Sequence, residues 1–359
     1  MTSKGFNDEI ISMFGLTINQ TRIMFSIQKL ITEWDCEKSR DKKIYSSKIS
    51  WKDSWETSIL DYLNTASDIG ETSLFDEESI CEQIDDEIAK SKNKSWYYIL
   101  ILECLTFVPY TALGQENDKE YKKCKYDGKF CQEKLEHFLA SQEYVSIEKI
   151  QRLMKCYKKN INTISGKKQK IVIGVLSVLA VTALAALCVV LMAPQIAVAL
   201  VGAQFHGLSG AALTSACLAA LGGGAIAYGG LGMAGGVAVL AGGGALLGLA
   251  GGSTAVGLVA TFANSPEFTL TQSAKLETIL KEVVLNVQQD VITAQKIIAQ
   301  CQESINVLNK KLTDLQIKDA KNKKEIKNLQ KSIDYILKSC KDMQVFTSSY
   351  EIGLQAGNE

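Results

Sequence analysis

Residues 171–193 read IVIGVLSVLAVTALAALCVVLMA, and they open a run of 96 residues, 171–266, without a single Asp, Glu, Lys or Arg. A helix needs roughly 20 consecutive apolar residues to cross a bilayer, so the run has room for about three or four crossings. Residues 171–193 are the best single candidate. We predict that this segment enters a membrane through Ile171, Val175, Leu179, Ala183, Val189 and Leu191.

The uncharged run is also rich in glycine, because 19 of the 27 glycines in the chain fall within it. In water each glycine weakens a helix by about 1 kcal/mol relative to alanine, whereas in lipid small residues let helices approach closely. Gly244, Gly248 and Gly252 recur every four residues, which places them on one helix face. We predict that they pack membrane-inserting helical hairpins together. The alternative is that so much glycine produces this spacing by chance.

The segments on either side of the run have the mixed charges of soluble proteins. Residues 1–170 carry 26 basic and 27 acidic side chains, and residues 267–359 carry 13 and 12. No basic domain indicates a nucleic-acid partner. We predict an all-α chain in four parts: a helical soluble domain (1–165), a glycine-rich hydrophobic membrane region (166–265), a long coiled-coil helix (266–345) and a tail (346–359).

Three features of the first part carry specific expectations. Residues 96–110 are its most apolar stretch, but they are too short to span a bilayer and contain Glu103, which favours a buried core helix over an interfacial membrane segment. The acidic residues between 76 and 87 indicate a solvated helix face, or alternatively a docking face for a basic partner. A helix from Ser146 ends in lysines that directly abut the apolar run, as the positive-inside rule expects on a cytoplasmic side.

Heptads dominate the third part of the chain. Two apolar series recur every seven residues between 280 and 343, interrupted at Asn322 and Asp319. The interruption is either a polar point in one coiled coil or the turn of a helical hairpin, and the lack of Gly and Pro there favours a continuous helix. Ser265-Pro266-Glu267 is typical of a helix start. We predict that this apolar seam serves assembly through Val291, Ile298, Ile305 and Leu312. In the resting chain we expect the seam to pack on the helix that begins at Ser146.

Signatures of catalysis are weak throughout the sequence. Residues 230–235 match G-x-G-x-x-G, but the next acid, Glu267, lies too far along the chain to hold a ribose. Cys124, Cys131 and His137 do not have zinc spacing. We therefore expect neither an enzyme nor a cofactor. His206 is the one potentially charged side chain in the run, either a pH trigger for insertion or a turn residue near the headgroups.

The N-terminus and the cysteines bear on the compartment. Residues 1–16 begin polar and acidic, unlike a secretory signal peptide. The ten cysteines are scattered, contain no Cys-x-x-Cys and include two in the apolar run, which favours reduced thiols. We expect synthesis in the cytoplasm and association with a membrane.

The order of parts resembles the helical pore-forming toxins of the cytolysin A and haemolytic-enterotoxin type. The similarity rests on a helix over 146–170, a hydrophobic head over 171–262 and heptads over 280–343. The glycine-rich runs also look like those of apolipoprotein-L-like and interferon-inducible membrane proteins. The first resemblance implies oligomerisation followed by exposure of the head, with a lipid bilayer and a homo-oligomer or related protein subunits as partners. The alternative function is a constitutive integral-membrane scaffold with partner-binding flanks.

Overall fold

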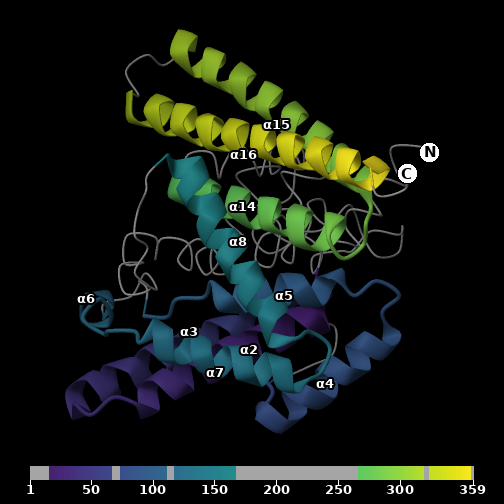
Figure 1. Ribbon diagram of the computed structural model, residues 1–359. Helices are drawn as coiled ribbons and strands as arrows, with labels where there is room; N and C mark the ends of the chain where they lie inside the picture. Colours follow the sequence, from purple (N-terminus) through teal and green to yellow (C-terminus); the bar gives the residue numbers. More distant parts are fainter. Residues whose placement is uncertain (1–15, 67–72, 111–116, 167–265, 319–322, 357–359) are drawn as a thin grey trace. The chain divides into compact units, whose positions relative to one another are not determined.

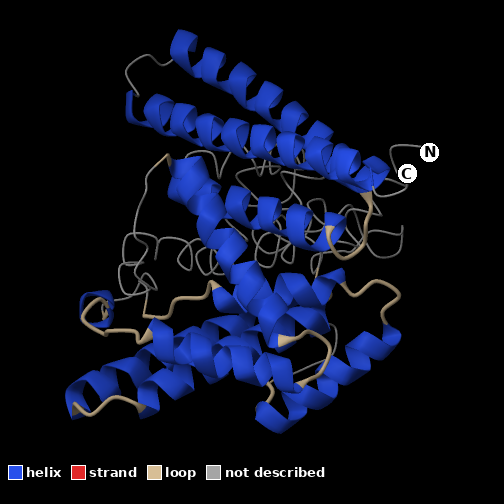
Figure 2. Ribbon diagram, in the orientation of Figure 1, coloured by secondary structure: helices blue, strands red, loops and turns tan. Residues whose placement is uncertain are grey.

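The computed structural model describes residues 16–66, 73–110, 117–166, 266–318 and 323–356 (Figure 1). Every regular element in these ranges is a helix, and none of their residues lies in a strand (Figure 2). The predicted all-α class is therefore confirmed. The chain divides into two compact units, with described residues up to Gln151 in the N-terminal unit and those from Arg152 onward in the C-terminal unit.

The N-terminal unit is built around one central helix, α2, which packs against α3, α4, α5 and α7. Its helices are α2 (Ile18–Glu37), α3 (Lys42–Ala66), α4 (Glu77–Lys90), α5 (Ser95–Leu105), α6 (Asp118–Tyr121) and α7 (Gly128–Ser141). Polar caps start several of these helices. Thr17 and Gln20 form a capping box at α2, Asp76 accepts the Ser79 N–H at α4, and Asp127 accepts the Phe130 N–H at α7.

Aromatic side chains and the whole of α5 form the core of the N-terminal unit. Trp51 and Trp55 stack with ring centroids 5.9 Å apart, and Phe25 meets Trp55 edge-on. Ten of the eleven residues of α5 are buried, Glu103 included. The prediction of a buried core helix within 96–110 is thus confirmed. Among the described helices we find none that combines the length and the apolar character needed to cross a bilayer.

The acidic stretch near residue 80 forms the outer face of α4. Ile80, Ile84 and Ile88 are buried, while the acidic side chains between them are exposed or half-buried. This alternation agrees with the predicted solvated face.

The C-terminal unit combines the helix before the uncharged run with the helices after it. It contains α8 (Ile147–Ser165) from Arg152 onward, α14 (Pro266–Ile279), the π-helix η3 (Leu280–Leu285), α15 (Val291–Lys318) and α16 (Lys323–Ala356). Two side chains of α8, Arg152 and Asn160, contact residues that follow the uncharged run. The helix start at Pro266 agrees with the predicted one.

The heptad region is not one continuous helix, and this part of the prediction is wrong. It divides into α14, η3, α15 and α16, and α15 and α16 lie side by side (Figure 1). Gln295 on α15 bonds to Glu351 near the end of α16, and the Cys340 thiol meets the Ile298 carbonyl, so the two helices run antiparallel. α16 also continues through most of the predicted tail, 346–359, to Ala356.

All of the predicted membrane positions lie outside the described residues. These are the inserting residues Ile171, Val175, Leu179, Ala183, Val189 and Leu191, the packing residues Gly244, Gly248 and Gly252, and His206. The four heptad residues assigned to assembly are described, and all of them lie on α15.

Candidate functional site

The candidate site is a buried polar cluster that joins the two helices flanking the uncharged run. α8 ends at Ser165, where Gly166 takes a positive φ of 67°, a conformation that suits glycine at a helix end. α14 begins at Pro266. Side chains on these two helices meet directly, so the chain leaves and re-enters the same structural unit.

Asn160 makes the central contact between α8 and α14. It is 1 % exposed and lies on the apolar face of α8, among Leu153, Tyr157 and Ile161. Its side-chain amide donates to the Thr278 hydroxyl at 3.0 Å, and that hydroxyl donates to the Ala274 carbonyl at 2.7 Å. Because both partners are buried, removing either leaves an unsatisfied polar group, which costs about 1–3 kcal/mol.

A second contact ties α8 to the π-helix. The Arg152 guanidinium donates to Glu282 at 2.6 Å, with Arg152 largely exposed and Glu282 nearly buried. Together the two contacts hold the start of α8 and its middle against the helices that follow the run.

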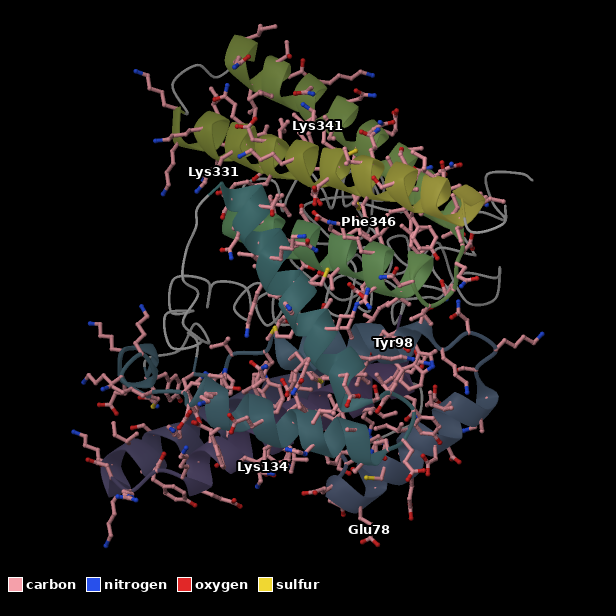
Figure 3. All side chains as sticks on the ribbon, in the orientation of Figure 1. Glu78, Tyr98, Lys134, Lys331, Lys341 and Phe346 are labelled. Atoms are coloured by element: carbon pink, nitrogen blue, oxygen red, sulfur yellow. The ribbon has the colours of Figure 1, made fainter. Side chains whose placement is uncertain are left out.

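Lys281 is the hub of the buried charges. Its ammonium lies 2.7 Å from a Glu277 oxygen, 2.7 Å from an Asp342 oxygen and 3.5 Å from the Asn160 side-chain oxygen. The Phe346 ring of α16, labelled in Figure 3, has its centroid 5.2 Å from the same nitrogen. The cluster therefore links α8, α14, η3 and α16 through one cation.

Glu277 is the most buried member of this cluster, with 0 % of its side chain exposed. Its second oxygen accepts from the Ser339 hydroxyl at 3.0 Å. The pKa of Glu277 is raised to about 8, mainly by burial and secondly by a hydrogen bond with Asp342, despite the attraction of Lys281. At neutral pH the carboxyl therefore holds its proton, so the cluster carries one cation and one anion.

The other two charges keep their ionised forms. The hydrogen bond from Glu277, and then the one from Lys281, lowers the pKa of Asp342, whose side chain is 37 % exposed. Burial lowers the pKa of Lys281, but attraction to Glu277 and hydrogen bonds to both carboxyls outweigh it and raise the pKa. The Lys281–Asp342 pair is thus the ionic link between η3 and α16.

The backbone at this cluster is irregular. The Asn286 N–H bonds to the Lys281 carbonyl and the Gln288 N–H to that of Val283, both five residues back, which is the π pattern. Gln289 then takes a left-handed φ of 56°, and Asp290 caps α15 by accepting the Thr293 N–H at 2.9 Å. Val287 lies in the turn between η3 and α15, where it is 46 % exposed although its heptad position predicts burial.

The cluster is an arrangement of paired charges between helices. Within the described ranges no group of three or more His, Cys, Asp or Glu side chains could hold a metal ion. The cluster instead places charges where their pairing decides whether four helical elements stay together. Buried ion pairs add little net stability, but separating the partners is costly because it leaves a buried charge without a partner.

The predicted assembly seam is covered within the chain. Ile298 and Ile305 are buried, whereas Val291 and Leu312 are half-buried. Their partner helix is α16, so the expected packing on the helix from Ser146 is not what covers the seam. Sequence reasoning missed Asn160, Glu277, Lys281 and Asp342. The available signal was a polar residue on the apolar face of α8 and three charged residues set among apolar residues in LETILKEVVL.

Comparisons of the chain with protein families, with curated proteins and with solved structures found no match.

Proposed function

We propose that this chain is a membrane-permeabilising protein without enzymatic activity, whose uncharged run enters a lipid bilayer. The observation that carries the proposal is the run itself, 96 residues without Asp, Glu, Lys or Arg. A water-exposed segment of this composition has no solvated face, whereas a bilayer accepts it.

The buried cluster supports a head that is tethered at both ends. Asn160 and Thr278 belong to the helices on either side of the run and share a hydrogen bond. A segment anchored in this way can enter a membrane as hairpins while its two flanks stay together in the C-terminal unit. The proposal includes self-assembly, and because Ile298 and Ile305 are buried against α16, assembly through them needs α15 and α16 to separate first.

Leakage of dye from liposomes tests the proposal. The full chain is purified without detergent and added to vesicles that contain a self-quenched dye. We expect leakage from the wild-type chain. Ala185→Asp, in the middle of the first predicted crossing, costs roughly 2.5–3.5 kcal/mol on membrane insertion and should suppress leakage.

Two controls make the outcome specific. Ala185→Leu keeps the segment apolar and should leak like the wild type, while Asn306→Asp places the same charge on an exposed position of α15 and should have no effect. Full leakage by Ala185→Asp would show that residues 171–193 do not cross the bilayer. A chain that can be extracted only with detergent and causes no leakage would favour the constitutive scaffold.

A further inference from the structure

The outward surface of α16 has a regular pattern and takes no part in the cluster of Glu277, Lys281 and Asp342. Positions 324, 327, 331, 334, 338, 341, 345, 348 and 352 recur every three or four residues, so they share one helix face, and all of them are exposed. We name this the outer face of α16. The opposite side carries the buried residues Leu329, Ile333, Ile336, Cys340 and Met343.

Charge is strongly one-sided along the first half of the outer face. It carries one aspartate, Asp334, and five lysines: Lys324, Lys327, Lys331, Lys338 and Lys341. Figure 3 labels Lys331 and Lys341. Asp342, the next acid along the helix, is already held by Lys281. The outer face therefore presents a row of cations about five turns long.

Apolar side chains continue the same face in its second half. Val345 and Ile352 are each 66 % exposed, and they are seven residues apart. Isolated exposed hydrophobics are ordinary on protein surfaces. Here they extend the line of lysines on one helix face, and basic residues beside exposed apolar ones are the pattern of helices that lie on membrane surfaces.

The outer face also lies at the exit of α8 toward the uncharged run. A side chain at Gly166 would place its Cβ 3.8 Å from the Lys338 ammonium. The hydrogen bonds from Glu277 and Lys281 are the larger causes of the lowered pKa of Asp342, and the charge of Lys159 on α8 lowers it further. α8 also carries two exposed lysines, Lys155 and Lys159.

We propose that the outer face of α16 docks on a bilayer surface that carries anionic phospholipid headgroups. The lysines contact the phosphates and carboxylates, and Val345 and Ile352 enter the interfacial layer. Charge complementarity selects this occupant, because anionic lipids attract clustered lysines that lie within about a Debye length of the surface. The proposal deepens the proposed function: docking would bring the start of the uncharged run to a membrane before insertion.

Sedimentation with vesicles tests the docking surface in the full chain. The probes are vesicles of phosphatidylcholine alone and vesicles that also contain phosphatidylserine. The test variant carries Lys331→Gln, Lys338→Gln and Lys341→Gln. The matched control carries Lys42→Gln, Lys43→Gln and Lys92→Gln, three exposed lysines of the N-terminal unit.

Each lysine near an anionic surface contributes roughly a fivefold factor in partitioning, so we expect the test variant to lose on the order of 100-fold in binding to phosphatidylserine vesicles. High salt should produce most of the same loss in the wild type. Binding to phosphatidylcholine alone should be unchanged, and the control variant should bind like the wild type. Slow thiol labelling of Cys340, which is buried in the unit, verifies that the test variant stays folded.

The outcomes separate this inference from the proposed function. If the wild type causes leakage but the test variant binds phosphatidylserine vesicles as tightly as the control, the docking surface is refuted and permeabilisation stands. If the test variant loses that binding and the wild type causes no leakage, docking stands and permeabilisation fails. If it instead keeps vesicle binding but loses self-association in ultracentrifugation, the outer face is an interface between copies and the lipid proposal is overturned.

Discussion

Replacing Glu277 with Gln should remove a pH dependence from the stability of the C-terminal unit. Gln cannot ionise, but its amide can still accept from Lys281 and donate to Ser339, which lie 2.7 and 3.0 Å from the carboxyl oxygens. The variant therefore keeps the shape and most contacts of the protonated glutamic acid. It differs from the wild type only where Glu277 would lose its proton.

The sign of the effect follows from proton binding. The pKa of Glu277 rises from its ordinary 4.5 to about 8 in the folded chain because of burial and the hydrogen bond with Asp342. The folded state therefore binds more protons at Glu277 between those values, so the contribution of Glu277 to stability is fully present below pH 4.5 and is lost as pH rises toward 8. One pKa unit corresponds to about 1.36 kcal/mol, and because Glu277 is already half ionised near its folded pKa of about 8, the wild type should lose about 2 kcal/mol in the opening of this cluster from about pH 6 to pH 8.

Hydrogen–deuterium exchange of the full chain measures this loss locally. After correction for the intrinsic pH dependence of exchange, protection in peptides covering η3 and the middle of α16 should fall roughly 50-fold in the wild type between about pH 6 and pH 8. Glu277→Gln should show no such fall, and helices of the N-terminal unit serve as an internal reference.

The matched control for this experiment is Glu303→Gln, which changes an exposed carboxylate on α15 and should behave like the wild type. Equal pH profiles for the wild type and Glu277→Gln would refute the assignment of a retained proton to Glu277.

Two further substitutions test the packing of each unit. Ile298→Ala should weaken the α15–α16 contact by about 2–5 kcal/mol and speed thiol labelling of Cys301 and Cys340. The control Ile292→Ala changes a 67 % exposed position of α15 and should leave the labelling rates unchanged. Equal labelling rates in the two variants would contradict the packing. Asp35→Asn breaks a buried pair with Lys48 at 2.5 Å and should cost about 3–5 kcal/mol, against under about 1 kcal/mol for exposed Asp53→Asn. Tryptophan fluorescence reports the second effect, since all four tryptophans lie in the N-terminal unit, and a loss no larger than that of Asp53→Asn would refute the role of the pair.

Local sequence signals predicted the elements whose burial pattern is simple. The apolar composition of α5 and the alternation on α4 each point to one environment, and both expectations agree with the structure. Pro266 likewise begins α14, because its fixed φ and missing N–H suit the first turn of a helix.

The hairpin could not be decided from local signals alone. The stretch between Lys318 and Lys324 lacks Gly and Pro, so propensity favours a continuous helix. Tertiary packing favours the other outcome, since a single chain has no second copy to cover its seam. Folding α16 back on α15 buries Ala294, Ile298, Leu308, Leu329 and Ile336 without a partner molecule.

The buried cluster was hidden for a different reason. Glu277 and Lys281 are four residues apart, which on most helices indicates an exposed ion pair. Here α14 is buried on nearly all sides, and η3 turns Lys281 toward Asp342 of α16. Only long-range contacts reveal that environment, because no periodicity within α14 marks an inner or an outer face.

The position of the cluster argues that it makes the contact between these helices sensitive to charge, rather than adding net stability. Apolar residues of similar volume would hold these helices together at least as well, because desolvation offsets most of the Coulomb attraction of a buried pair. A polar link differs from an apolar one in being sensitive to a proton or to a nearby charge. The Lys281–Asp342 pair joins η3 to α16, and Asp342 is the member that reaches solvent. Anionic headgroups at the outer face would compete with Asp342 for the surrounding lysines, so docking would weaken the link between η3 and α16 through this carboxylate.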